Sequence, residues 1–314
     1  YDIAKNCSVG KVICMSIKEM LLILYDLGLS NRSLSRLFKE INENQFRDLL
    51  EGEFLDIQFS NGIFDDNEIE LLSDINLIKE SVYYIKNLLT DYKTMGITYS
   101  FYYEDDYPTI LKYLNKPPFF IFMYGNKAVL DQGYKCSIVG TRNPSEMTIK
   151  QIELVVKEMV ANNIITVSGL AKGTDTYVHH FTLKYLGKTV AVLPSPITDI
   201  TPKANKVYIK EILRNNGLII SEYYKKDKTF KKSNFIDRNR IISGISNSVI
   251  IAECSERSGT MHTARFAFKQ NKPLYCFNNN SPGVVKILKS KSAKVYSSIR
   301  DLGVIIDVED NYFS

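Results

Sequence analysis

The spacing of apolar residues divides the chain into two parts. From residue 15 to residue 92, apolar side chains recur at helical intervals, as at Met20, Leu24, Leu34 and Leu37, with short turns between the runs. This period is typical of amphipathic helices, and hardly any segment here alternates as a strand would. We therefore expect a small helical domain over residues 1–97, which serves packing or interaction.

A different pattern begins at residue 98. Residues 98–127 are aromatic, extended and broken by prolines, which indicates a connector that ends by entering a sheet. The expected strands beyond it are residues 136–139, 164–167, 189–193, 218–220, 249–252 and 274–277. The expected helices are residues 145–161, 175–185, 204–214 and 259–269. This alternation predicts an α/β domain over residues 98–314, with a parallel sheet covered by helices on both faces.

The composition changes this picture little. With 314 residues, of which 45% are hydrophobic, the chain can bury the cores of two domains. A formal net charge of +5 permits a polyanionic partner without requiring one. The five cysteines form no CxxC pair, which argues against a zinc site or a disulfide framework and favours reduced, cytoplasmic thiols. No apolar run approaches the roughly 18 residues of a membrane helix, so no membrane association is expected.

The loop after the first expected strand contains Gly140, Thr141 and Arg142 and leads into a helix capped by Asn143 or Ser145. Ligands of parallel sheets sit beyond the carboxyl ends of the strands, and a helix start beside an arginine suits a phosphate. The loop lacks the GxGxxG dinucleotide fingerprint. A capped turn with a surface arginine explains this loop, taken alone, equally well.

The loop after the second expected strand contains Ser168, Gly169 and Lys172. Its glycines permit close backbone approach, while Ser168 and Lys172 can face an anion. His179 and His180 follow and invite a catalytic interpretation. A packing or capping histidine is favoured, because no nucleophile is assigned beside them and metal-ligand spacing is absent.

Two later segments add basic and helix-opening residues. Lysines and aromatics alternate over residues 223–232, which suggests single-stranded nucleic acid, although a solvated loop is favoured for this stretch alone. Arg238, Asn239 and Arg240 predict a paired-arginine turn, and residues 258–260 a small-residue turn whose helix start offers an anion site. The basic residues expected to converge on one sheet edge are Arg142, Lys172, Lys203, Lys232, Arg238 and Arg240.

The order of these motifs carries a family resemblance. VGTR at 139–142, SGLAKGTD at 168–175, PKAN at 202–205, RNRIISGIS at 238–246 and RSGTMHTA at 257–264 together resemble the DNA-processing protein A (DprA/Smf) family, over roughly residues 105–302. The resemblance implies an extended Rossmann-like domain that binds single-stranded DNA without catalysing a reaction. It also implies a homodimer that passes the DNA to a RecA-type recombinase in natural transformation or recombination.

The resemblance also assigns residues. The basic pocket of the family maps onto Arg142, Lys203 and Lys232. Together with the strand-end loops, the expected nucleic-acid-binding residues are Gly140, Thr141, Arg142, Ser168, Gly169, Lys172, Lys203, Lys232, Arg238, Arg240, Ser258, Gly259 and Thr260. No catalytic residue, metal or cofactor is expected. Residues 194–197 depart from the family's glycine-rich turn, and the few dozen residues after the last expected strand predict no C-terminal winged helix.

Two other functions remain open. Related Rossmann-like folds sense small nucleotides or act as phosphoribohydrolases, whose PGGxGTxxE pattern places a carboxylate three positions after its threonine. Thr263 stands there after Thr260, so only Glu253 and Glu222 are substitutes, and holding loop N–H groups or the arginines of the RNR motif is their favoured role. The third possibility is a structural protein with a vestigial pocket, whose helical domain recruits partners.

Overall fold

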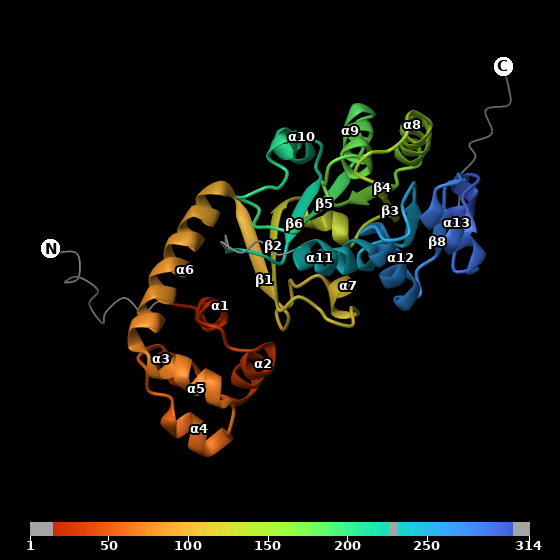
Figure 1. Cartoon of the computed structure of the whole chain (residues 1–314). Coiled ribbons are helices and arrows are strands. Elements are labelled where there is room, and N and C mark those ends of the chain that lie inside the picture. Colours follow the sequence, from red (N-terminus) through yellow and green to blue (C-terminus); the bar gives the residue numbers. More distant parts are fainter. Residues whose placement is uncertain (1–14, 226–231, 304–314) are drawn as a thin grey trace. The chain divides into compact units, whose positions relative to one another are not determined.

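The computed structural model describes residues 15–225 and 232–303 of the chain (Figure 1). These residues belong to two compact units, Tyr1–Gly96 and Ile97–Ser314. Among the described residues, none of the helices combines the length and apolar composition that crossing a membrane requires.

The first unit is helical. Its described helices are α1 (Ile17–Leu27), α2 (Asn31–Glu40), α3 (Glu43–Leu50), α4 (Leu55–Asn61), α5 (Asp66–Ser73) and α6 (Ile75–Met95). The apolar stripes that predicted them face inward, since Met20, Leu24, Leu34 and Leu37 are all buried. Polar residues set the helix starts: Ser16 caps α1 by accepting a hydrogen bond from the backbone N–H of Glu19.

The second unit is built on one sheet with the strand order β1-β2-β6-β5-β4-β3-β7-β8-β9 in its described part. The strands are β1 (Ile97–Phe101), β2 (Phe120–Gly125), β3 (Lys135–Val139), β4 (Ile165–Ser168), β5 (Thr189–Leu193), β6 (Leu218–Ser221), β7 (Ser248–Ile251), β8 (Leu274–Cys276) and β9 (Lys294–Val295). β3 to β9 pair in parallel. β1 and β2 are antiparallel and extend the sheet beside β6.

Helices cover both faces of this sheet (Figure 1). The helical segments are α7 (Thr109–Lys112), η2 (Lys127–Leu130), α8 (Glu146–Ala161), α9 (Thr174–Lys184), η3 (Lys203–Lys206), α10 (Val207–Arg214), α11 (Lys232–Gly244), α12 (Thr260–Lys269), α13 (Pro282–Lys289) and η4 (Ile299–Leu302). Val249 and Ile251 pack with residues of α11 and α12, while Ile250 packs on the other face with α8 and α9. The predicted parallel sheet with helices on both faces is confirmed.

The prediction was wrong for one segment that matters for the site. Arg238, Asn239 and Arg240 lie inside helix α11 and not in a turn. Packing explains the helix better than local preference does, because Ile241, Ile242 and Ile245 at its carboxyl end are buried in the core. The connector also contributes more than expected, since it supplies β1, α7 and β2.

The strand order creates a crevice beside β3. From β3 the chain adds β4, β5 and β6 on one side, whereas β7, β8 and β9 lie on the other. The loops that leave the carboxyl ends of β3 and β7 therefore diverge toward opposite parts of the sheet. Such a switch point is where open α/β sheets bind their ligands.

Candidate nucleic-acid interface

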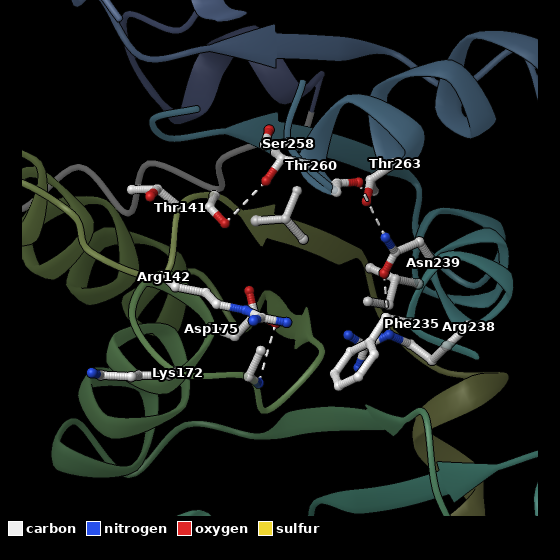
Figure 2. A pocket seen from close by; sticks show the side chains of 15 residues that line it. Thr141, Arg142, Lys172, Asp175, Phe235, Arg238, Asn239, Ser258, Thr260 and Thr263 are labelled. Atoms are coloured by element: carbon white, nitrogen blue, oxygen red, sulfur yellow. Dashed lines mark hydrogen bonds between the residues drawn. The ribbon is translucent and has the colours of Figure 1, made fainter. Parts of the chain in front are cut away.

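A pocket of about 300 Å³ lies at the switch point, bounded by the loops after β3, β4 and β7 and by one side of α11 (Figure 2). Of the residues expected from the sequence, it is lined by Gly140, Thr141, Arg142, Lys172, Arg238, Ser258, Gly259 and Thr260. Ser168, Gly169, Lys203 and Arg240 are not among the residues that line it. The side chain of Lys232 lies outside the described residues.

The start of α8 already holds an anion of the protein itself. Glu253 accepts hydrogen bonds from the backbone N–H and from Oγ of Ser145, both at 3.0 Å. Burial alone would raise the pKa of Glu253, but the bonds from Ser145 and Thr148 hold it below its usual value. Ser145 is the cap of this helix, and the favoured role of Glu253 as a holder of loop N–H groups is confirmed.

In the loop after β4, too, a carboxylate of the protein itself occupies the backbone N–H groups. The buried Asp175 accepts hydrogen bonds from the backbone N–H groups of Gly169 and Ala171, at 3.2 and 3.3 Å. Burial raises the pKa of Asp175, and the charge of Arg238 opposes the rise. Ser168 is fully buried and donates to the carbonyl of Ile138 at 2.8 Å, so its hydroxyl faces the interior of the protein and does not line the pocket.

The glycines of this loop allow close approach within the protein. A Cβ atom on Gly169 would overlap the guanidinium group of Arg238. Gly173 has φ +85°, and a Cβ atom there would overlap the backbone of Arg142. Next to it, the backbone N–H of Thr174 donates to the carbonyl of Thr141 at 3.1 Å. The loops that carry Arg142 and Lys172 are therefore fixed against each other.

Both arginines of the RNR motif are engaged inside the protein. Arg238 is 3% exposed and donates to the carbonyls of Gly169 and Val192, and burial lowers its pKa to about 10. Arg240, two positions on and hence on another side of the helix, donates to both carboxylate oxygens of Glu222, at 2.8 and 2.6 Å. Arg240 is therefore held outside the pocket, and the favoured role of Glu222 in holding this arginine is confirmed.

The start of α12 remains open. Its cap residue is Gly259, which has no side chain to accept a hydrogen bond. Within the described ranges, the backbone N–H groups of Gly259 and Thr260 have no acceptor. Neighbouring groups hold this segment, since Asn239 Nδ2 donates to the Gly259 carbonyl at 3.4 Å and Thr260 Oγ1 to the Gly140 carbonyl at 3.0 Å. Free N–H groups at a helix start are a binding site for an external anion.

Arg142 and Lys172 bring positive charge to this opening. Both side chains are exposed, and neither makes an ion pair or a side-chain hydrogen bond with another described residue. Figure 2 shows the guanidinium of Arg142 reaching toward the pocket centre, where it lies 5.4 Å from the ring centroid of Phe235. Lys172 lies at the edge with its ammonium group pointing away from the centre (Figure 2).

Lys203 lies near this pocket without lining it. It is exposed at the first position of η3. Asn205, two residues later, donates to the carbonyl of Leu170 at 2.8 Å, which places the segment beside the loop that carries Lys172. Residues 226–231 of the lysine-rich stretch lie outside the described part of the chain.

Sequence reasoning missed several side chains that line the pocket, above all Phe235, Asn239 and Asp175. Phe235, Arg238, Asn239 and Ile242 are spaced i, i+3, i+4 and i+7, which puts them on one side of α11. This helical spacing is the sequence signal that could have placed Phe235 and Asn239 beside Arg238 at one site. The expected turn at Arg238 obscured it, because a turn has no such helical side.

The histidine of α9 has a structural role. His179 is fully buried, and its Nδ1 lies 2.8 Å from Thr189 Oγ1. Burial lowers the pKa of His179 to about 3, so the ring is neutral at neutral pH. The favoured interpretation as a packing histidine is confirmed. Among the described residues, no group of three or more His, Cys, Asp or Glu side chains is arranged to hold a metal ion.

The fold and the pocket define a Rossmann-like α/β protein with a pocket at the topological switch point of its sheet. A family model, DNA recombination-mediator protein A, matches residues 98–306, and the chain belongs to this family. The DNA processing protein DprA of Bacillus subtilis (strain 168) is 30% identical over 219 residues, 68% of this chain and 73% of the relative. DprA of Streptococcus pneumoniae (strain R6) is 31% identical over 250 residues, 79% of this chain and 82% of the relative. The family resemblance predicted from the motifs is confirmed.

Solved structures give the same result. The X-ray structure of DprA from Streptococcus pneumoniae matches with a TM-score of 0.69 and 28% identity, over 92% of this chain and 98% of that one. A DNA processing protein A structure from Helicobacter pylori matches with a TM-score of 0.58 and 30% identity, over 66% of this chain and 94% of that one. The Helicobacter pylori structure was described for its single-stranded DNA binding mode.

Proposed function

We propose that this protein binds single-stranded DNA, with a backbone phosphate at the open start of α12 and the guanidinium of Arg142 paired to it. The observation that carries the proposal is the contrast between the helix starts at the pocket. Glu253 fills the start of α8 and Asp175 fills the loop before α9, whereas Gly259 and Thr260 leave their N–H groups free beside Arg142. A phosphate supplies the acceptor oxygens and the negative charge that this arrangement lacks.

Further phosphate contacts are proposed along the same side of the molecule. Lys172 and Lys203 are exposed on segments joined through Asn205, and Lys232 begins α11. Positively charged side chains spaced along one side of the protein suit a single strand of DNA, whose backbone carries a negative charge at every nucleotide. The single-stranded DNA described for the Helicobacter pylori relative supports this choice of ligand.

The proposed activity is binding without catalysis. Asp175 is the carboxylate that lines the described pocket, and it is already bonded to two loop N–H groups. Glu222 and Glu253 are bonded to Arg240 and to Ser145. A general base must be free to take a proton from water. A nucleotide phosphoribohydrolase or sensor therefore ranks second, and release of base from a nucleoside monophosphate would reverse this order.

The partners are proposed from the family. A recombination mediator hands DNA to a recombinase, so we propose a RecA-type recombinase as the protein partner, a homodimer as the active form and the cytoplasm as the location. We also propose that residues 1–97 and 98–314 act as separate domains. Light scattering of the purified chain tests the dimer, and co-sedimentation of a recombinase with DNA-bound protein tests the hand-over.

The first experiment is a salt titration of oligonucleotide binding. A fluorescent oligothymidine and its duplex form are compared for the wild-type protein, for Arg142→Glu and for Lys210→Glu, which reverses an exposed charge on α10 outside the pocket. We expect tight, salt-dependent binding of the single strand, loss of this binding in Arg142→Glu and near-normal binding in Lys210→Glu. Equal binding by both variants would remove Arg142 from the site, and no binding at low salt would remove DNA as the ligand.

A further inference from the structure

Phe235 is the aromatic residue of the described pocket, and its ring faces the side chain of Arg142. The two residues come from segments far apart in the sequence, the loop after β3 and the first turn of α11 (Figure 2). The guanidinium carbon lies 5.4 Å from the ring centroid, within the range of a cation–π contact. Among the described residues, the Arg142 side chain has this ring contact and no ion pair or side-chain hydrogen bond.

We propose that Phe235 is a positioning residue, whose ring holds the Arg142 guanidinium inside the pocket that the open start of α12 also lines, so that phosphate binding depends on the pair. This inference rests on the proposed function, because it assigns a role within the same site. A long, exposed arginine otherwise samples many rotamers, and a cation that is already in place loses less conformational entropy when its ligand arrives.

The kind of contact is what makes Phe235 suitable. A guanidinium group packs on an aromatic ring through its flat face and presents its N–H donors along its edge. Arg238 and Arg240 are also held in place, but through hydrogen bonds to carbonyls and to Glu222 that consume those donors. Arg142, held by a ring, keeps its donors for a phosphate. This difference separates the ligand-binding arginine from the structural ones.

The ring itself is presented by a firmly attached part of α11. Arg238 and Asn239, three and four residues after Phe235 on the same side of the helix, are 3% and 8% exposed. Arg238 bonds to the carbonyls of Gly169 and Val192, and Asn239 to that of Gly259. The helix that carries the ring is thus tied to the loops after β4 and β7, which form the other walls of the pocket.

A half-buried aromatic ring that lines the pocket of a single-strand binder has another possible use, which is stacking on a base. The two roles differ in their dependence on Arg142. A ring that positions Arg142 has no effect once that side chain is removed. A ring that stacks on a base contributes whether or not Arg142 is present.

A double-mutant cycle separates these roles. Oligothymidine binding is measured across a salt series for the full-length wild type, Phe235→Leu, Arg142→Ala and the double variant. We expect Phe235→Leu to raise Kd about three- to tenfold in the wild-type background and less than about twofold in the Arg142→Ala background. The salt slope should fall with Arg142→Ala and stay unchanged with Phe235→Leu, since the latter removes no charge.

Two further variants test whether a packing defect, or the loss of any phenylalanine ring, explains the effect of Phe235→Leu. Phe235→Tyr keeps the ring and should bind within about twofold of wild type, which a general packing defect at this position would not predict. Phe59→Leu makes the same change at a ring that is 85% exposed on α4 and should leave Kd unaltered. An equal effect of Phe235→Leu in both backgrounds, or none in either, would overturn the positioning role while leaving the DNA site intact. An unaffected Arg142→Ala variant would overturn both the site and this inference.

Discussion

Arg238 occupies the space that Gly169 leaves by having no side chain: a Cβ atom at position 169 would overlap the guanidinium group. The same guanidinium donates to the Gly169 carbonyl and to the carbonyl of Val192 in β5. A buried arginine thereby joins α11 to the ends of two neighbouring strands. The charge of Arg238 therefore supports the architecture of the pocket, whereas Arg142 is the arginine to which we assign the proposed phosphate contact.

Gly169→Ala should therefore destabilise the fold. The methyl group forces the buried guanidinium away from its carbonyl partners, and buried groups that lose such partners cost about 2–4 kcal/mol of unfolding free energy. Urea denaturation monitored by circular dichroism measures the change. An unfolding free energy equal to that of the wild type would show that the loop shifts freely and that the Arg238 contacts are dispensable.

Gly259→Ala, in contrast, should leave the stability of the fold nearly unchanged and weaken DNA binding. Position 259 has φ −57°, and no heavy atom lies within 4 Å of an added Cβ atom. We expect a change in unfolding free energy within about 0.5 kcal/mol, together with weaker oligothymidine binding, because the methyl group enters the space in front of the free N–H groups. Undiminished affinity in a folded Gly259→Ala protein would place the phosphate elsewhere.

The Glu222–Arg240 pair should matter for stability and not for DNA binding. Both side chains are largely buried, with relative exposures of 16% and 13%. Glu222→Ala leaves the Arg240 charge without its carboxylate and should cost about 1–3 kcal/mol, with no change in the salt slope of binding. Glu256→Ala is the matched control, since Glu256 pairs with Lys286 at 51% and 58% exposure and should cost under about 0.5 kcal/mol. A lower salt slope in Glu222→Ala would mean that Arg240 takes part in binding.

His179 should make the fold sensitive to acid. Its pKa is about 3 when folded and near 6.5 when unfolded, so below pH 6.5 the unfolded chain binds a proton that the folded chain excludes. The contribution of the neutral His179 to the free energy of unfolding is complete above pH 6.5 and is lost as the pH falls toward 3. Between these two pKa values the loss is about 1.4 kcal/mol per pH unit. Urea denaturation of wild type and His179→Gln between pH 4.5 and 7.5 measures this slope, which the variant should lack. Parallel curves would show that His179 titrates alike in both states.

The sequence predicted the central sheet well because its strands are short, apolar runs bounded by glycines and polar caps. Residues 249–252 and 189–193, for example, lie in the core as expected. The helix around Arg238 escaped prediction because its first half is polar, and its stability comes from Ile241, Ile242 and Ile245, which pack on the sheet. Local preference does not report such tertiary support.

The sequence predicted only part of the candidate site, again because contacts between distant residues leave no local pattern. Arg142, Lys172 and residues 258–260 do line one pocket, since strand-end loops of a parallel sheet meet at one edge. Whether a polar residue in such a loop faces a ligand or the protein depends on distant partners. Ser168 and Arg238 are engaged internally, and the Arg238–Gly169 bond spans 69 positions of the sequence. No local pattern contains that information.

The pocket exists only in the fully assembled unit, because its walls come from segments such as Gly140 and Thr260, which are 120 positions apart in the sequence and joined by a hydrogen bond. A ligand of this pocket therefore has no counterpart to bind in the unfolded chain. By mass action, a ligand at one hundred times its Kd adds about 2.7 kcal/mol to the free energy of unfolding. The melting temperature should then rise with the logarithm of ligand concentration, so that heat resistance itself becomes a measure of occupancy.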